Sequence, residues 1–276
     1  MNIRSKWYNR ILERVLALTF VLIAVMPVYI VVSNAFRRTL DIKRMPPQLI
    51  FAPVYTHFQR VLSVDNFARY FLNSLIIAGS ATLLVIMLGT LAAYGLRLFK
   101  SRIGIRLSNI MMLGKLVPSI TILIPLYIML NRIQLTGHYI SPILAHAAIS
   151  VPFVTWLMRG FIEDIPGELL ESATEMGCSR MMTFFYIVLP LLMPAMASAL
   201  ILAMQSSWNE LLFSLTLTNV KTYPLTVAVA RFTGAMSVDW GKCSAAATIT
   251  LAPIVILGFF MQRYLVTGMT AGAVKG

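Results

Sequence analysis

The sequence predicts an all-α membrane protein, a polytopic bundle of six transmembrane helices. The chain has 276 residues, of which 58% are hydrophobic and only 12% are charged, and its mean hydropathy is +0.80. Soluble domains contain roughly 45–50% apolar and about 25% charged residues, so much of this surface must face lipid. A bilayer span needs about 20 mostly apolar residues. The chain offers six such runs: 15–35, 71–95, 107–130, 140–160, 190–216 and 243–265.

The first apolar run follows a basic segment and therefore resembles a secretory signal peptide. The hydrophobic core of a signal peptide is about 7–15 residues long, whereas the run 15–35 is longer. We therefore expect an uncleaved first span. Several spans contain proline, which is tolerated in membranes where neighbouring helices satisfy the freed backbone groups. This favours a packed bundle of kinked helices, and the prolines concerned are Pro27, Pro118, Pro125, Pro152 and Pro253.

The charges of the short loops predict the orientation, because Lys and Arg accumulate in cytoplasmic loops. The loop 97–106 contains four basic residues and no acid, and the loop after the third span offers only Arg132 and His138. We therefore expect both ends in the cytoplasm, the N-terminus as residues 1–14 and the tail as residues 266–276. The loop 36–70 would then be external, although it is basic. Long loops translocate largely regardless of charge, and its basic residues are Arg37, Arg38, Lys43, Arg44, Arg60 and Arg69.

The net charge of +13 does not indicate a nucleic-acid-binding protein. Its basic residues lie between apolar runs, where they orient a membrane protein. The two cysteines, Cys178 and Cys243, are predicted on opposite sides of the membrane and form no disulfide framework. The sequence indicates no metal site, no cofactor and no catalytic residue, and it contains no G-x-x-x-x-G-K-[ST] phosphate-binding loop.

The cytoplasmic segment 163–190 carries the clearest local pattern. Pro166 suits the first position of a helix, and Gly177 suits the left-handed residue that ends one. Ser179 is placed to cap a second helix that runs into Pro190. At about 100° per residue the first helix is amphipathic. Its acidic face is Glu168, Glu171 and Glu175, and its apolar face is Leu169, Leu170, Ala173 and Met176.

Such a helix rests either on lipid headgroups or on a protein partner. Interfacial helices usually present Lys and Arg to the anionic cytoplasmic leaflet. Three glutamates would be repelled by that surface, so a protein partner is favoured.

The order of residues in this segment resembles the EAA loop of binding-protein-dependent ABC permeases. Glu171-Ser-Ala173 is followed after three residues by Gly177 and after nine more by Ile187-Val-Leu-Pro190. Ser172 and Met176 depart mildly from the pattern. Further segments resemble the MalG-like carbohydrate-uptake branch, mostly after residue 70: Pro125-Leu-Tyr127, Pro152-Phe153, Trp156-Leu-Met-Arg-Gly-Phe161, Trp208-Asn-Glu210, Asp239-Trp-Gly241 and Ala271-Gly-Ala-Val-Lys-Gly276.

The resemblance implies a type I ABC importer permease in a bacterial inner membrane, with a core over 71–265 that follows a first span and external loop over 15–70. It implies a second homologous permease, two copies of a cytoplasmic ABC ATPase and an extracytoplasmic solute-binding protein as partners. The segment 163–190 would be the coupling loop on which the ATPase docks, through Glu168, Leu169, Leu170, Glu171, Ala173, Met176 and Gly177. The implied solute is a sugar or sugar derivative.

Polar residues within the spans are candidates for a solute path, since charged groups in a bilayer normally face a cavity or a partner. Lys115 either faces such a cavity or snorkels to the cytoplasmic surface. His146 is either a satisfied packing residue or a ligand. In the run 205–210 we expect Gln205 and Trp208 to face the path. Asn209 either joins them there or bonds to neighbouring helices, as we expect for Glu210.

Two other functions compete with this interpretation. An ion-coupled secondary transporter would need intramembrane carboxylates as ion sites, and Glu210 is the clearest acid inside a predicted span. A non-transporting membrane scaffold would give no reason for the geometry of the segment 163–190.

Overall fold

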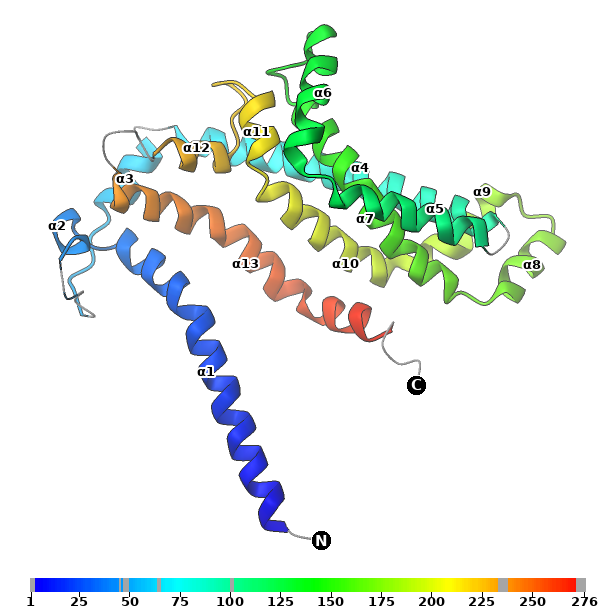
Figure 1. Cartoon of the computed structure of the whole chain (residues 1–276), viewed down its shortest axis with the longest axis horizontal. Helices are drawn as coiled ribbons and strands as arrows, with labels where there is room; N and C mark the ends of the chain where they lie inside the picture. The colour runs from blue at the N-terminus through cyan, green and yellow to red at the C-terminus, as the bar shows by residue number, and fades with distance from the viewer. Residues whose placement is uncertain are drawn as a thin grey trace. The chain divides into compact units, whose positions relative to one another are not determined.

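The computed structural model describes residues 3–44, 46, 50–63, 66–99, 102–232 and 238–271, and it describes the helix but not the side chains for 3–6, 102 and 260–271. In these ranges, every secondary-structure element longer than one residue is a helix (Figure 1). The all-α prediction is therefore confirmed. The predicted tail 266–276 lies partly outside the described residues, since these end at residue 271.

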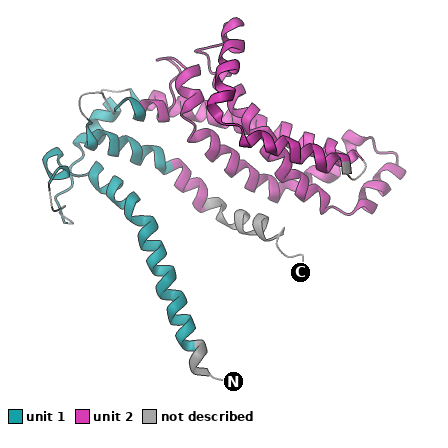
Figure 2. Cartoon of the chain, in the orientation of Figure 1, with its two compact units in different colours: residues 1–67, 229–252 teal, residues 68–228, 253–276 magenta. Residues whose placement is uncertain are grey.

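The chain divides into two compact units, shown in teal and magenta in Figure 2. Unit 1 comprises residues 1–67 and 229–252 and unit 2 comprises residues 68–228 and 253–276. The helices that begin in unit 1 are α1 (Ile3–Ala35), α2 (Thr39–Ile42), α3 (Thr56–Ser63), α4 (Phe67–Leu98) and α13 (Trp240–Ala271). Those that begin in unit 2 are α5 (Arg102–Leu113), α6 (Ser119–Arg132), α7 (Ile140–Glu163), α8 (Gly167–Glu175), α9 (Arg180–Thr183), α10 (Leu189–Trp208), α11 (Leu212–Leu217) and α12 (Leu225–Arg231).

Five stretches of the described helices are long and apolar enough to cross a membrane, and a bent pair of helices adds a sixth if it counts as one span. The five are Trp7–Ala35, Phe67–Leu98, Ile140–Glu163, Arg180–Trp208 and Trp240–Phe259. Each of them overlaps one of the six predicted runs. The prediction of a multi-pass bundle is thereby confirmed.

The third predicted span, 107–130, is not one straight helix. A 3-10 turn at Gly114–Leu116 follows α5, and the two sides of the break are bent by 94°. Val117 has an extended backbone, with ψ 126°, and Pro118 follows it. The proline ring disfavours helical geometry at the preceding residue, which explains why the helix stops here. Lys115 therefore lies in the turn and not inside a continuous span.

The fifth predicted span, 190–216, is also wrong in its extent. The helical segment begins earlier, at Arg180, and α10 ends at Trp208. Between α9 and α10 the residues Phe184–Val188 form a π-helical turn. Pro190 lacks an N–H and its ring crowds the carbonyl four residues earlier, so a locally widened turn is the expected response.

The main core of unit 2 lies where α4, α7 and α10 pack together. Its buried side chains are mostly aliphatic, including Val85, Val154, Met158 and Leu192. A Cβ atom at Gly89 would lie 2.7 Å from Cγ1 of Val154. Only glycine permits this close approach of α4 to α7, which is how small residues serve helix packing in membranes.

The buried side chain of His57 on α3 joins separate segments of unit 1 to one another. Its Nε2 lies 2.9 Å from the carbonyl oxygen of Arg37, and its ring packs directly on Gly241 at the start of α13. The backbone N–H of Val54 donates to the carbonyl of Phe36 at 2.8 Å. These contacts hold the loop after α1 against the N-terminal end of α13.

Candidate functional site: a coupling helix and a polar cluster at the end of a span

The segment 163–190 folds as a short helix, a tight turn and a second helix. The first helix, α8, begins directly after Pro166, whose backbone is extended. Glu168 lies in its first turn, where a carboxylate is favoured by the helix dipole. The predicted amphipathic helix is therefore present, one residue shorter at its start than expected.

Gly177 ends α8 in the left-handed conformation, with φ +84°. The N–H of Cys178 donates to the carbonyl of Ala173, and the N–H of Gly177 donates to the carbonyl of Thr174, both at 3.0 Å. These two bonds form a Schellman motif, which satisfies the last carbonyls of the helix. The predicted positive φ at Gly177 is confirmed.

Ser179 caps the second helix, as predicted, because its Oγ accepts the backbone N–H of Met182 at 3.3 Å. The hydroxyl of Tyr94 on α4 donates to the carbonyl of Arg180 at 3.0 Å. Before α8, the guanidinium of Arg97 donates to the carbonyl of Ile165 at 3.4 Å. α4 is therefore bonded to residues on both sides of α8, to Ile165 before it and to Arg180, the first residue of α9, after it.

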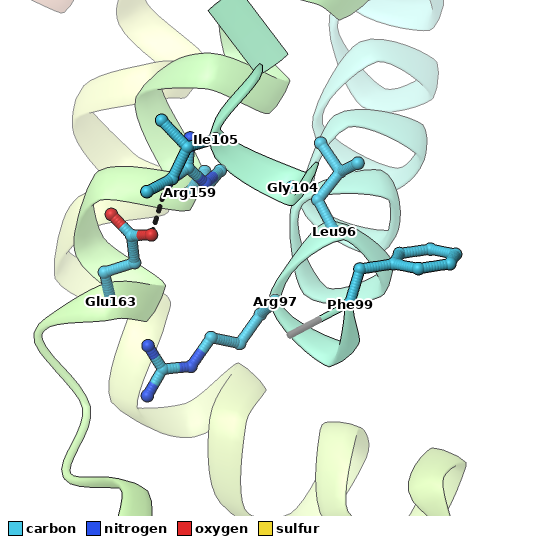
Figure 3. Close-up of a pocket in the computed structure, with 7 residues that line it drawn as sticks. All are labelled: Leu96, Arg97, Phe99, Gly104, Ile105, Arg159 and Glu163. Carbon is cyan, nitrogen blue, oxygen red and sulfur yellow. Dashed lines mark hydrogen bonds and ion pairs between the residues drawn. The ribbon is translucent and has the colours of Figure 1, made fainter. Parts of the chain in front are cut away.

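Arg159 on α7 strengthens the same region. It is buried, and it donates to the hydroxyl of Ser108 on α5 and to the carboxylate of Glu163. Arg159 and Glu163 line a cavity of about 200 Å³ together with Arg97 and Gly104. Figure 3 shows how these residues lie around it. Arg159 was not among the predicted site residues. An arginine near the end of an apolar span was the signal that could have found it.

The predicted apolar face of α8 is divided between the protein's own core and solvent. Ala173 is fully buried, and Leu170 packs on the core of unit 2. Leu169 is 41% exposed and Met176 is 76% exposed. Of the four apolar residues among the predicted docking residues, Ala173 therefore cannot reach a partner in this conformation, and its small side chain instead lets α8 lie close to the bundle.

The acidic face of α8 is exposed over its whole length, at Glu168, Glu171 and Glu175. Glu171 and Glu175 also line an open groove of about 480 Å³ between α8 and the end of α4, where Arg97 stands on the opposite wall. The segment thus presents carboxylates and two apolar side chains outward from a rigidly held helix.

Of the polar residues predicted to line a solute path, Lys115, Gln205 and Asn209 are exposed. The ammonium of Lys115 lies 5.9 Å from the ring centroid of Phe153 on α7, so the charge stands over an aromatic face. Trp208 differs from the expectation, because only 2% of it is exposed and its ring meets Phe71 edge-on at 6.0 Å. In this conformation Trp208 packs inside the bundle.

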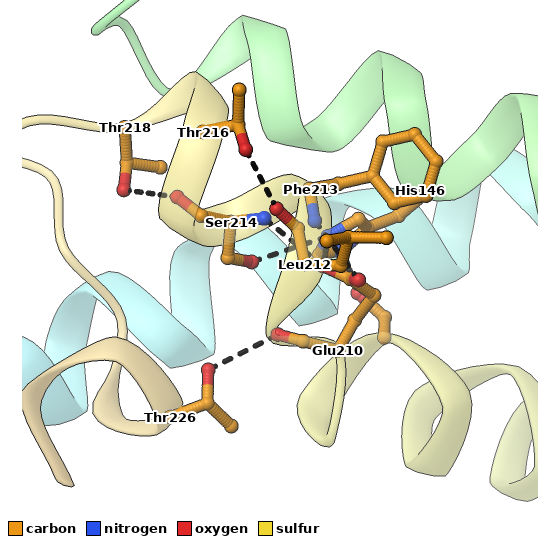
Figure 4. A network of polar contacts seen from close by, with 9 residues as sticks. His146, Glu210, Leu212, Phe213, Ser214, Thr216, Thr218 and Thr226 are labelled. Atoms are coloured by element: carbon orange, nitrogen blue, oxygen red, sulfur yellow. Dashed lines mark hydrogen bonds and ion pairs between the residues drawn. The ribbon is translucent and has the colours of Figure 1, made fainter. Parts of the chain in front are cut away.

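His146 on α7 lies at the centre of a polar cluster at the end of α10 (Figure 4). Its Nδ1 is 2.6 Å from Oγ of Ser207, and its Nε2 is 3.2 Å from Oε2 of Glu210 and 3.3 Å from Oγ of Ser214. The Glu210 carboxylate also accepts the N–H groups of Phe213 and Ser214, both at 3.0 Å. His146 is therefore a satisfied packing residue. Glu210 bonds to neighbouring helices, as predicted.

The family model of the binding-protein-dependent transport system inner membrane component matches residues 85–271, about two thirds of the chain. The chain belongs to this family. These permeases are membrane-spanning components of ABC transporters, so the prediction of a multi-pass importer permease is confirmed and the rival transporter and scaffold classes are not favoured. As a permease, the chain is a transporter component rather than a catalytic subunit.

Named relatives extend over most of the permease. The probable ABC transporter permease protein y4oR of Sinorhizobium fredii is 34% identical over 88% of this chain and 88% of its own length. The diacetylchitobiose uptake system permease protein DasC of Streptomyces coelicolor is 31% identical over 98% of each chain. The trehalose/maltose transport system permease protein MalG of Thermococcus litoralis is 32% identical over 83% of this chain and 84% of its own. The resemblance to the MalG-like branch is thereby confirmed.

The fold of the permease matches that of a solved importer. A chain from the crystal structure of a bacterial ABC transporter involved in the import of the acidic polysaccharide alginate superposes with a TM-score of 0.79. The match covers 96% of this chain and 99% of that one at 18% identity. At this identity the likeness establishes the fold, that of a type I ABC importer permease.

Proposed function

We propose that this permease imports a sugar or sugar derivative across a bacterial inner membrane, driven by ATP that a separate subunit hydrolyses. The proposed assembly contains a second homologous permease, two copies of a cytoplasmic ABC ATPase and an extracytoplasmic solute-binding protein. The names of its relatives support a carbohydrate, since they include uptake permeases for diacetylchitobiose and for trehalose and maltose. The absence of a phosphate-binding loop from the sequence is consistent with a motor in another chain.

The observation that carries the proposal is the way α8 is mounted. A helix that presents Leu169, Met176 and Glu171 outward offers a partner both apolar area and charge. Because Arg97 and Tyr94 of α4 bond to the segments that flank α8, a push on α8 moves the span α4 rather than bending a loop. Gly177 fixes the angle between α8 and the following helix. We infer that ATPase closure is transmitted through these contacts, with Glu168 in the same docking surface.

The proposed solute path includes Lys115, Gln205 and Asn209. Gln205 and Asn209 are four residues apart, which places them on one side of the end of α10. Exposed amides at the end of an apolar helix suit a solute rich in hydroxyl groups, because each amide both donates and accepts hydrogen bonds. We assign Trp208 the role of holding this end of α10 in place through its contact with Phe71.

The proposed orientation places both termini in the cytoplasm and the loop 36–70 outside. α8 then faces the ATPase, and the loop between α11 and α12 faces the solute-binding protein. The proposed domain division keeps residues 71–265 as the permease core and residues 15–70 as the first span and external loop.

Cross-linking in the assembled importer tests the partners and the orientation together. In a background with Cys178→Ser and Cys243→Ser, a single cysteine replaces either Met176 on α8 or Val220 in the loop before α12, both exposed in this chain. We expect Met176→Cys to cross-link to the ATPase and Val220→Cys to the solute-binding protein. A cross-link from position 220 to the ATPase would contradict the orientation, and no cross-link from position 176 would contradict the docking surface.

A further inference from the structure

A cavity of about 710 Å³ lies in unit 1 beside the C-terminal end of the first span, α1. One wall is formed by Met26, Tyr29 and Ile30 of α1, and Trp240 at the start of α13 also lines it. Trp240 is 56% exposed. Tyr and Trp are enriched where a span meets the headgroup region of a bilayer, so these aromatics place the cavity at that level.

The cavity runs along the span rather than across it. Met26, Ile30 and Ser33 follow one another at helical spacing on one face of α1 and all line the cavity. At a rise of 1.5 Å per residue, Met26 and Ser33 are separated by about 10 Å along the helix axis. The wall therefore changes from apolar to polar over a distance comparable to the depth of a lipid's ester and headgroup region.

The polar end of the cavity is lined by three cations, Arg37, Lys43 and Arg44, and no carboxylate is among the described residues that line it. Arg37 is buried, with its guanidinium 4.7 Å from the ring centroid of Phe51 and its Nη1 3.5 Å from Oδ1 of Asn34. Lys43 and Arg44 are exposed. One cation is thus fixed in place and two are available at the rim.

We propose that this cavity binds the headgroup of an anionic phospholipid, with an acyl chain against Met26 and Ile30 and the phosphate among Arg37, Lys43 and Arg44. Arginine presents donors in a planar fork that matches a phosphate, and lysine adds a point charge. The amphipathic wall favours a lipid over a free anion, because a free anion would gain nothing from the apolar end. The site also gives a reason for the basic loop 36–70, since three of its six basic residues line this cavity.

Native mass spectrometry of the whole importer in detergent tests the site. The variant Lys43→Gln/Arg44→Gln is titrated with phosphatidylglycerol and with phosphatidylcholine. The matched control is Arg38→Gln/Arg60→Gln, which removes two exposed cations from the same loop that do not line the cavity. Each cation near a membrane surface strengthens the binding of anionic lipid about fivefold. We therefore expect phosphatidylglycerol binding to weaken on the order of 25-fold in the cavity variant and to stay near the wild-type value in the control.

Five outcomes would overturn the proposal. Equal loss in both variants would mean that the loop attracts anions without a site, and no loss in either would mean that the cavity takes no anionic lipid. If phosphatidylcholine bound as strongly as phosphatidylglycerol, the cations would have no role in selecting the lipid. Displacement of phosphatidylglycerol by free glycerol phosphate would identify a site for anions rather than a site for a lipid. Loss of the second permease from the cavity variant would also contradict the proposal, because the cavity would then serve subunit contact.

Discussion

His146 and Glu210 meet across 64 residues of sequence, with Nε2 of the imidazole 3.2 Å from Oε2 of the carboxylate. The carboxylate lies just before α11 and accepts two backbone N–H groups of that helix, from Phe213 and Ser214. One side chain therefore caps the start of α11 and fastens it to α7. This arrangement occupies Glu210 with structural bonds, which argues against its use as an ion site.

Replacement of Glu210 should destabilise the permease. Glu210→Ala leaves the N–H groups of Phe213 and Ser214 without their acceptor, and an unsatisfied backbone group costs about 1–3 kcal/mol. Glu210→Gln retains one acceptor oxygen and should lose about half as much. The free energy of unfolding in detergent micelles measures the effect, with the exposed Glu175→Gln as the control. Unchanged stability in Glu210→Ala would show that the carboxylate does not hold α11.

The sequence predicted the spans more accurately than it predicted where they break. Apolar runs and loop charges are averages over many residues, so the positions of α4, α7 and α13 followed from them. The 94° bend at Pro118 and the end of α10 at Trp208 depend on single residues. Pro118 was visible as a proline within a span, but the contact of Glu210 with His146 joins residues that are remote in sequence.

The candidate site shows the same division. The turn at Gly177 is local, since its hydrogen bonds join residues within one helix end, and it was predicted correctly. The fate of the apolar face of α8 was not predictable, because helical periodicity identifies an apolar face without showing what covers it. The protein's own core covers Ala173 and supports Leu170, whereas Met176 is left exposed. The packing of Trp208 was not predictable either, because Phe71, which it contacts, lies on a different helix.

Lys115 should matter for uptake if the solute is anionic. It is exposed at the break between α5 and α6, with its ammonium near Phe153. Lys115→Gln removes the charge and should raise the solute concentration needed for half-maximal uptake on the order of tenfold, since a hydrogen bond to a charged group contributes about 1.5–3 kcal/mol. Lys115→Arg should retain most of the affinity. If Lys115→Gln assembles normally and its uptake kinetics are unchanged, Lys115 does not contact the solute and instead snorkels to the cytoplasmic surface.

Glu171 should contribute a contact to the ATPase. It lies on the exposed face of α8, so Glu171→Lys reverses a charge without disturbing the core of the permease. We expect less ATPase subunit to copurify with the variant and less solute-stimulated ATP hydrolysis. Glu13→Lys on α1 makes the same charge reversal outside the segment 163–190 and serves as the control. Equal loss in both variants would point to net charge rather than to a specific contact.

Gly177 offers the sharpest test of coupling, because a Cβ atom added there would meet nothing within 4 Å while φ is +84°. Any effect of substitution must therefore come from the backbone conformation and not from a clash. Left-handed geometry costs ordinary residues roughly 1–2 kcal/mol, costs β-branched residues more, and is tolerated best by asparagine. Solute-stimulated ATPase activity of the reconstituted importer should then fall in the order glycine, asparagine, alanine, valine.

The control for this series is Gly167→Ala at the start of α8, where a Cβ atom also meets nothing within 4 Å and φ is not left-handed. It should behave like the wild type. All variants should insert into the membrane at normal levels, because none changes a residue of a span. In Gly177→Val the angle between α8 and the following helix should change, so that Leu169 and Met176 no longer meet the ATPase and both transport and stimulation are lost. Full stimulation and uptake in Gly177→Val would mean that the segment 163–190 does not couple the ATPase to the spans.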